Sequence, residues 1–360
     1  MKAVIAGGGT AGHVNPAVAL AEALAGDDVS FLGTARGAES RIVPAAGFPL
    51  DAIEVAGFDR AKPLTFPRTA ARAAGAIFAA RNLIHRREAE VVVGMGGYVS
   101  LPAVLGAASL RVPVVLHEQN IVFGLAHRVT KPFATRVAVS FEETLAAAGK
   151  NGIFVGNPVA SRFIDFSRTG QREKAVARFD LDPGRKTLLV FGGSQGAKRI
   201  NEAAAGLSGY WGERSDLQIL HIAGDASHRP SVEIRPGGLI YRMVEFVDDM
   251  TEAYALADLA LCRGGASTFA EITVVGLPAI IVPYPHHRDQ QQLRHARLAE
   301  GRGAAVVLED HATTPESIAR IAGGLLADEA KLKNMSESAA ALGRPDAALR
   351  LAEVVRAVAR

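Results

Sequence analysis

The residues best suited to acid–base chemistry follow a glycine-rich turn near the start of the chain. Residues 7–12 read Gly-Gly-Gly-Thr-Ala-Gly, and His13 comes directly after them. The G-x-G-x-x-G spacing between a strand and a helix allows the backbone to approach a phosphate at the start of that helix. An imidazole at this place can exchange a proton near neutral pH. His13 is therefore a candidate general base, although a lone histidine here can equally cap the helix.

Two further polar clusters follow apolar runs in the first half of the chain. Residues 94–100 contain three glycines after the run 91–93. Their backbone amides could wrap a second phosphate, or they could form a tight turn that needs glycine. Residues 117–120, His-Glu-Gln-Asn, end the run 114–116. A strand end inside a core does not need four adjacent hydrogen-bonding side chains, so this cluster fits recognition of a polyol or a sugar.

The second half carries a cluster that could bind a nucleotide. Residues 262–268 leave the apolar run 259–261 and open a helical pattern that includes Glu271. Arg263 and the amides of a helix start can hold a diphosphate, and a carboxylate one turn later can accept both hydroxyls of a ribose. The same residues are compatible with a plain capping box. The polar run 283–292 either faces a ligand or forms a solvated helix start.

These clusters need a scaffold whose strands end on one edge. Short β-branched runs alternate with Ala/Leu-rich helical stretches, a rhythm that predicts parallel α/β sheets. The rhythm restarts at residue 187, where a strand again runs into a glycine turn. We therefore expect two Rossmann-like domains facing each other across a cleft, with ligands at the carboxyl ends of the strands. The predicted strands are residues 3–6, 29–32, 91–93, 114–116, 137–139, 187–191, 217–221, 259–261, 279–282 and 304–307.

The boundary between the two domains is predicted near residue 160. It follows Gly-Asn-Pro at residues 156–158 and precedes the polar segment 165–171. The first domain then spans residues 1–160 and the second spans residues 161–344. Apolar residues at helical spacing near the end predict a closing helix at about 345–360, which we expect to pack back on the first domain.

Composition excludes several classes of protein. The chain has 360 residues, of which 49% are hydrophobic and 21% charged, a globular balance. Its single cysteine, Cys262, cannot form an intramolecular disulfide, and no Cys/His cluster has zinc spacing, so we expect a reduced compartment and no metal. The uncharged stretch 91–110 is broken by glycine and proline, which predicts strand, loop and helix rather than a membrane span. We expect no secretion signal.

Taken in order along the chain, the motifs resemble the MurG family of glycosyltransferases over essentially the full length. The resemblance implies a GT-B fold and a role in peptidoglycan synthesis, and hence in cell shape and division. It implies transfer of N-acetylglucosamine, with inversion, from its UDP donor to the C4 hydroxyl of lipid I, undecaprenyl-diphosphoryl-N-acetylmuramyl-pentapeptide. It implies neither a cofactor nor a metal and no nucleic acid partner. The motifs that carry it are residues 7–13, 96–98, 117–120, 156–158, 192–197 and 262–263, with Glu271 and Gln292.

The resemblance also assigns roles on the acceptor side. His13 would be the general base, Glu118 would orient nearby groups, and Asn120 would contact the sugar at the reacting centre. Family members often carry an arginine where this chain has Ala160, and Arg162 would replace it. The residues implied to hold the acceptor diphosphate are Thr10, Ala11, Gly12, Gly96, Gly97, Tyr98 and Arg162.

On the donor side, the resemblance implies that the backbone of Phe246 and Val247 reads uracil. Glu271 would accept the ribose hydroxyls. His295 stands where the family often has asparagine. The residues implied to bind the donor are Ser194, Gln195, Phe246, Val247, Arg263, Ala266, Ser267, Thr268, Glu271, Gln291 and Gln292.

A basic stretch supplies a candidate membrane contact. Residues 60–87 contain seven Lys or Arg residues and no acidic residue. The lipid-linked acceptor implied by the resemblance stays in the bilayer, so the enzyme would be peripheral, at the cytoplasmic face of an anionic membrane. Each basic residue near such a surface contributes about 1 kcal/mol. A core helix with a solvated basic side is the alternative. The residues expected to face the membrane are Ile77, Phe78, Arg81, Leu83, Ile84, Arg86 and Arg87.

Three other functions stay open on sequence grounds. A UDP-sugar epimerase would share Arg263 and Glu271 but would not need the basic apolar stretch. A membrane-bound sensor would bind a UDP-sugar without consuming it. A nicotinamide-dependent oxidoreductase is disfavoured because residues 33–35, after the second strand, read Gly-Thr-Ala, where an acidic residue should follow.

Overall fold

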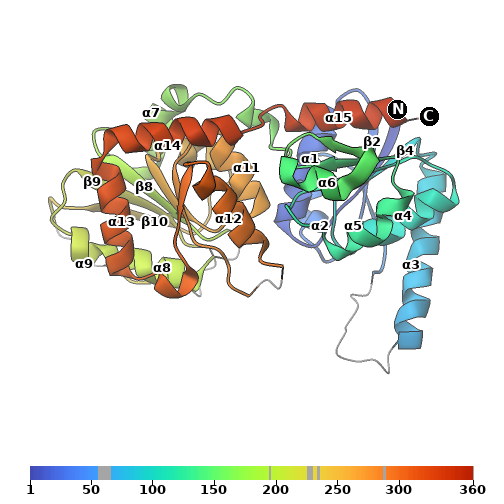
Figure 1. Ribbon diagram of the computed structural model, residues 1–360, viewed down its shortest axis with the longest axis horizontal. Coiled ribbons are helices and arrows are strands. Elements are labelled where there is room, and N and C mark those ends of the chain that lie inside the picture. The colour runs from blue at the N-terminus through green and yellow to red at the C-terminus, as the bar shows by residue number, and fades with distance from the viewer. Residues whose placement is uncertain (56–65, 194–195, 225–229, 233–235, 287–288, 360) are drawn as a thin grey trace. The chain divides into compact units, whose positions relative to one another are not determined.

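The computed structural model of the protein describes residues 1–55, 66–193, 196–224, 230–232, 236–286 and 289–359, and gives only the backbone for 66–71. The chain divides into two compact units (Figure 1). Unit 1 comprises Met1–Ser161 and Arg344–Arg360, and unit 2 comprises Arg162–Gly343. Each unit is built on one parallel sheet with helices on its faces, which confirms the predicted class of two Rossmann-like α/β domains.

Unit 1 contains a seven-stranded sheet in the order β3-β2-β1-β4-β5-β6-β7. Every neighbouring pair is parallel. Strands covered on both faces are apolar throughout: in β4, Val91 and Val93 pack into one core cluster and Val92 into the other. The strands are β1 (Lys2–Ala6), β2 (Asp28–Gly33), β3 (Leu50–Ala52), β4 (Val91–Gly94), β5 (Val114–Glu118), β6 (Arg136–Val139) and β7 (Gly152–Phe154).

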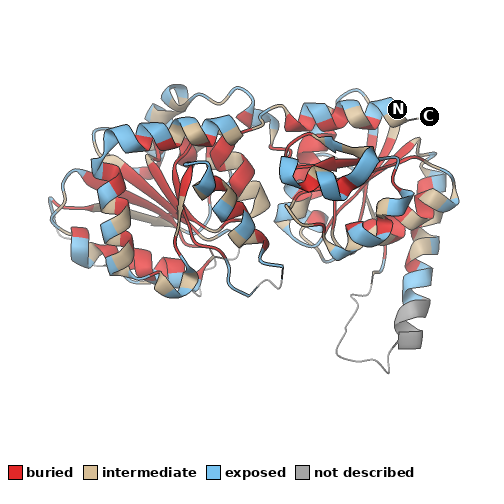
Figure 2. Ribbon diagram, in the orientation of Figure 1, coloured by how far each residue is buried: buried red, intermediate tan, exposed pale blue. Residues whose placement is uncertain are grey.

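The helices of unit 1 cover both faces of its sheet. One core cluster joins the sheet to α1, α2 and the C-terminal helix α15, and the other joins it to α3 and α4. Figure 2 shows the strands buried and the outer helix faces exposed. The helices are α1 (Ala11–Ala23), α2 (Glu39–Ala45), α3 (Phe66–Arg86), α4 (Ser100–Ser109), α5 (Leu125–Thr130), α6 (Leu145–Ala148) and α15 (Ala347–Val358).

The C-terminal helix α15 packs on unit 1, as predicted. Leu351, Ala352 and Val355 lie in the same core cluster as β1 and α1. The uncharged stretch 91–110 forms β4, a loop and α4, also as predicted. Among the described residues, every helix is too short or too polar to cross a bilayer.

Unit 2 contains a six-stranded parallel sheet in the order β10-β9-β8-β11-β12-β13. One face packs against α8, α9, α13 and α14 in a single core cluster. The strands are β8 (Lys186–Phe191), β9 (Leu217–Ile222), β10 (Ile240–Val244), β11 (Leu259–Cys262), β12 (Ala279–Ile281) and β13 (Ala305–Val307). The helices are α7 (Arg168–Phe179), α8 (Lys198–Ala205), α9 (Leu207–Trp211), α10 (Met250–Leu256), α11 (Ala266–Val274), α12 (Gln291–Gly301), α13 (Pro315–Ala327) and α14 (Glu329–Leu342).

The sequence pattern missed three strands, and all three lie at the edges of the sheets. They are β3 and β7 in unit 1 and β10 in unit 2. No residue of β3 or β7 is buried, and only Tyr241 of β10 is. An edge strand is covered less than a central one, so it lacks the continuous apolar run by which the central strands were recognised.

Candidate functional site

The glycine-rich loops after β1 and β4 pack against each other at the carboxyl edge of the sheet in unit 1. A Cβ atom at Gly97, which has φ of +77°, would lie only 2.5 Å from the carbonyl oxygen of Gly8, so only glycine fits there. The Ser100 hydroxyl accepts the amide of Gly96 at 2.9 Å and lies 3.0 Å from the carbonyl oxygen of Ala6. These contacts hold the two predicted phosphate loops together.

A buried carboxylate, Glu39, supports the first loop. Its Oε2 accepts the amide of Gly9 at 2.9 Å, and its Oε1 accepts the amide and the hydroxyl of Thr34 at 2.9 and 2.7 Å. Burial favours the neutral acid, but the bonds from Thr34 and Gly9 outweigh it and lower the pKa of Glu39. A Cβ atom at Gly8 would lie 2.4 Å from this carboxylate. Gly8 is thus needed to leave room for Glu39, and the amide of Gly9 is already bonded to this carboxylate.

His13 lies in the first turn of α1 and is half-buried. Within the described part of the chain, its Nδ1 atom is buried and has no hydrogen-bond partner. Burial lowers the pKa of His13, and the nearby carboxylate of Glu118 opposes this shift only in part. A lowered pKa keeps the ring neutral at neutral pH, which is the state that a general base needs.

Glu118 ends β5 and collects four hydrogen bonds. Its Oε1 accepts the amide of Asn120 at 3.0 Å and the Asn120 side-chain amide at 3.2 Å. Its Oε2 accepts the amide of Gly124 at 2.9 Å and contacts Nδ1 of His127 at 2.9 Å. Burial favours the neutral acid, but the bonds from His127, Gly124 and Asn120 prevail and lower the pKa of Glu118 to about 2. This arrangement suits an orienting role.

Two neighbours of Glu118 serve the protein itself rather than a sugar. His117 is fully buried and its Nε2 bonds the carbonyl oxygen of Gly156 at 2.9 Å. Gln119 is also buried and donates to the carbonyl oxygen of Met95 at 3.3 Å. The expectation that all four polar side chains of this cluster recognise a sugar is therefore wrong for these two, because their polar atoms are enclosed. Asn120 is only half-buried.

Sequence reasoning missed His127, which lies on α5 and is 3% exposed. It stands nine residues after Glu118, a separation that marks no common motif. Only the fold of the loop after β5 brings the two side chains together. No other signal in the sequence distinguishes this histidine from a surface one.

In unit 2, residues 266–268 form the first turn of α11, as expected for the donor site. The N-cap is Gly265, and no described side chain caps this helix. The alternative of a capping box between Thr268 and Glu271 is therefore wrong. Glu271 instead accepts a hydrogen bond from the hydroxyl of Tyr254 at 2.7 Å, a contact that the sequence did not predict.

The pKa of Glu271 is raised by burial, while the Tyr254 hydroxyl and the guanidinium of Arg162 oppose the shift. Arg162 lies in unit 2, where it forms an ion pair of 3.0 Å with Asp249. The structure therefore groups Arg162 with the predicted donor residues, although the sequence assigned it to the acceptor phosphate.

We expect Tyr254→Phe to raise the Kd for UDP about tenfold, because Glu271 loses a hydrogen bond that fixes and ionises it. Without this bond the pKa of Glu271 rises further, so the loss of affinity at acidic pH should begin at a higher pH than in the wild type. Calorimetric titration with UDP between pH 5 and 8 measures both effects. The matched control is Tyr210→Phe, since Tyr210 is 56% exposed. Equal affinities of wild type and Tyr254→Phe would contradict the expectation.

Arg263 is held by protein partners. Its Nη1 lies 2.7 Å from a carboxylate oxygen of Asp310 and donates to the carbonyl oxygens of Val282 and Pro283 at 3.2 Å. Its guanidinium also lies over the ring of Tyr284. These contacts fix the position of the charge beside α11, and a diphosphate there would share Arg263 with Asp310.

The remaining predicted donor residues differ in exposure. Gln291 is buried, and Gln292 accepts the amide of Tyr284 through its Oε1 at 3.0 Å. His295 is buried and bonds the carbonyl oxygen of Gly264 at 2.9 Å, so it supports the loop before α11. The Phe246 side chain is 56% exposed and that of Val247 is buried. Ser194 and Gln195 lie outside the described residues.

The described part of the basic stretch forms α3, whereas residues 60–65 lie outside the described residues. The expectation for one predicted membrane residue, Ile84, is wrong. Ile84 is fully buried in the core cluster under α3 and α4, so it cannot reach a bilayer. Phe78 is 62% exposed and Arg86 is exposed, whereas Ile77, Arg81 and Leu83 are half-buried. Arg87 forms an ion pair of 2.7 Å with Asp51.

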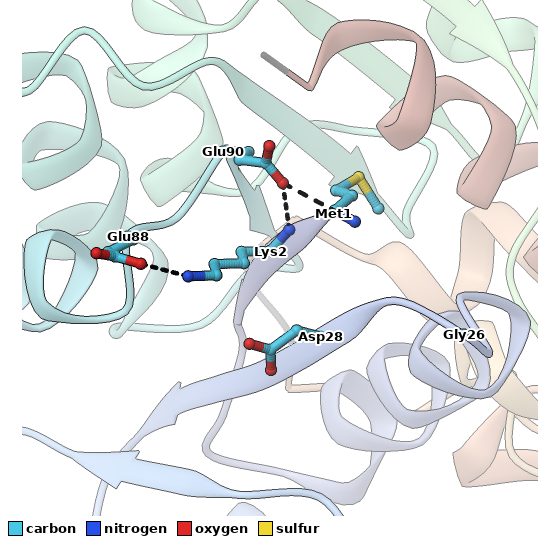
Figure 3. A pocket seen from close by; sticks show the side chains of 6 residues that line it. All are labelled: Met1, Lys2, Gly26, Asp28, Glu88 and Glu90. Atoms are coloured by element: carbon cyan, nitrogen blue, oxygen red, sulfur yellow. Dashed lines mark hydrogen bonds and ion pairs between the residues drawn. The ribbon is translucent and has the colours of Figure 1, made fainter.

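A charged surface pocket lies at the opposite end of the strands of unit 1 (Figure 3). It is formed around the starts of β1 and β2. The ammonium of Lys2 bonds Glu88, and the backbone amide of Lys2 bonds Glu90. It contains none of the predicted site residues. Among the described residues, no group of three or more His, Cys, Asp or Glu side chains could hold a metal ion.

Solved structures similar to this chain share its fold. The crystal structure of MurG from Acinetobacter baumannii matches it with a TM-score of 0.77 at 27% identity and covers 99% of this chain and 100% of that one. A UDP-GlcNAc 2-epimerase from Neisseria meningitidis, bound to UDP-GlcNAc, matches with a TM-score of 0.69 at 12% identity, covering 99% and 100%, which is a likeness of fold alone.

Sequence comparison is more specific. The glycosyltransferase family 28 N-terminal domain matches residues 3–139 and the C-terminal domain matches residues 187–351. The UDP-N-acetylglucosamine–N-acetylmuramyl-(pentapeptide) pyrophosphoryl-undecaprenol N-acetylglucosamine transferase of Halothermothrix orenii is 38% identical over 358 residues, or 96% of this chain and 95% of its own. The protein of that name from Streptomyces coelicolor is 40% identical with the same coverage. The chain therefore belongs to glycosyltransferase family 28 and, within it, to the MurG family of N-acetylglucosamine transferases.

Proposed function

We propose that this glycosyltransferase moves N-acetylglucosamine from UDP-N-acetylglucosamine to the C4 hydroxyl of lipid I, giving lipid II and UDP. The substrates named for its relatives support this assignment. The observation that carries it is His13: a half-buried imidazole with a lowered pKa at the carboxyl edge of the sheet in unit 1, beside an ionised carboxylate.

In the proposed reaction, His13 accepts the proton of the acceptor hydroxyl. The oxygen then forms a bond to the anomeric carbon of the donor sugar while the bond to the UDP oxygen breaks. A single displacement of this kind inverts the anomeric configuration from α to β. The acceptor diphosphate would lie at the start of α1, formed by residues 10–12, together with Gly96, Gly97 and Tyr98.

Unit 2 would supply the donor contacts. The start of α11 and the guanidinium of Arg263 would stabilise the charge that grows on the diphosphate as UDP leaves. Glu271, held by Tyr254, would accept the ribose hydroxyls. We infer that these charges suffice without a metal or another cofactor.

The test is incubation of the purified protein with UDP-N-acetylglucosamine and a short-chain lipid I analogue. We expect disaccharide product and UDP in equal amounts, formed only when both substrates are present. Conversion of the donor to an epimer without the acceptor would indicate the alternative of an epimerase. Binding of the donor without any turnover would indicate a sensor.

We further propose that unit 1 binds the cytoplasmic face of the membrane reversibly. The exposed apolar and basic side chains of α3, Phe78 and Arg86, support this proposal. An exposed apolar row, at a spacing of four residues, begins on α5 and consists of Leu125, Val129 and Phe133. Both α3 and α5 pack against α4, so this row lies on the same side of the sheet as α3.

Replacing Arg81 and Arg86 with Gln should weaken sedimentation with vesicles that contain anionic lipid, by roughly thirtyfold at low salt, since each of the two basic residues contributes about 1 kcal/mol. Binding of the wild type should fall as salt rises. The control replaces two basic residues of unit 2, Lys198 and Lys333, with Gln. Binding that is indifferent to both salt and the α3 variant would reject this surface.

A further inference from the structure

Three imidazole nitrogens of unit 1 are buried without a hydrogen-bond partner among the described residues: Nδ1 of His13, Nδ1 of His117 and Nε2 of His127. A buried polar atom without a hydrogen-bond partner destabilises the folded protein. The rings of His13 and His127 both lie close to Gly96. A Cβ atom built on Gly96 would lie 3.1 Å from Nδ1 of His13 and 3.7 Å from Cε1 of His127. Nδ1 of His13 and Nε2 of His127 thus belong to two rings that lie beside the same glycine in the loop after β4.

The bond to Glu118 fixes the orientation of the His127 ring. An ionised carboxylate can only accept, so Nδ1 of His127 must carry the hydrogen of this 2.9 Å bond. In the neutral ring, Nε2 then has a free lone pair, and in the protonated ring it has a free N–H. His127 is 3% exposed, so water does not readily satisfy this nitrogen.

We propose that Glu118 and His127 form a positioning pair for His13, in which the carboxylate fixes the His127 ring and that ring controls the charge and tautomer of His13 across Gly96. The inference rests on the proposed function, because it takes His13 as the base. The titratable groups that act on His13 are the attracting carboxylate of Glu118 and the repelling rings of His127 and His117. His127 is thus a positioning residue, and it does not itself touch the reacting atoms.

The test uses substitutions that separate the two ring nitrogens of His127. In His127→Asn the side-chain amide takes the place of Nδ1 and keeps a donor for Glu118, while Nε2 is removed. In His127→Gln the amide reaches the place of Nε2, while the bond to Glu118 is lost. His311→Asn removes an imidazole that is 80% exposed in unit 2 and serves as the matched control.

The expected result is a displaced pH profile. Removal of the His127 ring, which opposes a proton on His13, should raise the pKa of His13 in His127→Asn and move the acid limb of kcat/KM to higher pH. Removal of the attracting carboxylate in Glu118→Gln should move the same limb to lower pH. His127→Gln should lower kcat because the bond to Glu118, which fixes the side chain at this position, is lost. The KM for UDP-N-acetylglucosamine and the profile of the control should not change.

Two outcomes would overturn the inference. An unchanged profile in His127→Asn would mean that His127 has only a structural role. A raised KM for the lipid acceptor with an unmoved acid limb would mean that Nε2 contacts substrate. A wild-type enzyme that transfers no sugar rejects the proposed function instead, and the inference is then decided by spectroscopy.

Nuclear magnetic resonance of the wild type, labelled with ¹⁵N at histidine, supplies this second measurement and does not depend on folding of a variant. We expect His127 in the Nδ1–H tautomer, as its bond to Glu118 requires, and a titration of His13 that also displaces the resonances of the His127 ring. A His127 ring that carries its proton on Nε2, or a His13 titration independent of His127, would contradict the positioning pair.

Discussion

Replacing His13 with alanine is expected to lower kcat by about 10²–10⁴-fold, which is the usual contribution of a general base. Burial lowers the pKa of this imidazole, so the wild-type ring is neutral and able to accept the hydroxyl proton at neutral pH. Alanine has no group that can replace it. The measurement is single-turnover transfer to a short-chain lipid I analogue at saturating donor.

The binding of UDP provides the control for this prediction. The predicted donor contacts lie in unit 2, whereas His13 lies in unit 1, so the Kd for UDP should be the same in the variant and the wild type. His311→Ala, which removes an exposed imidazole in unit 2, should leave kcat unchanged. Near-full turnover in His13→Ala would show that another group takes the proton.

Replacing Glu118 with alanine is expected to destabilise unit 1 by about 3–5 kcal/mol, because it leaves buried donors without their acceptor. The amides of Asn120 and Gly124 and the ring of His127 lose their common partner. Glu118→Gln should cost less, since it keeps the shape and part of the hydrogen bonding. Chemical denaturation followed by far-ultraviolet circular dichroism measures the free energy of unfolding.

The pH dependence of this effect has a definite sign. The pKa of Glu118 is lowered to about 2 in the folded protein, below the ordinary value of 4.5. Its contribution to stability is therefore fully present above pH 4.5 and is lost as the pH falls toward 2. The difference in unfolding free energy between wild type and Glu118→Gln should be constant near pH 6 and shrink below pH 4.5. Glu337→Gln, at a position that is 67% exposed, should show no such trend.

The inner strands and the chemical motifs could be predicted from the sequence because their signals are local. A parallel strand covered on both faces must be a short apolar run, and the residues that leave it reach the carboxyl edge of the sheet. This is why His13, Glu118 and Glu271 were found as candidates. The edge strands β3, β7 and β10 gave no such run and were missed.

The partners of these residues could not be predicted because they depend on long-range contacts. Glu39 reaches back thirty residues to the amide of Gly9, and Tyr254 reaches Glu271 from another helix. The pattern of α3 likewise shows an amphipathic basic helix, but only packing against α4 reveals that Ile84 belongs to its covered face.

By itself, the sequence determined the two α/β halves, the order of the motifs and the family, because these depend on residue type and spacing along the chain. Only the tertiary structure decided which polar atoms are paired, which are buried and which charges act on one another. Folding sets the local dielectric and the distances between groups that are remote in sequence. These two quantities determine the pKa of an imidazole such as His13, and therefore whether it can act as a base.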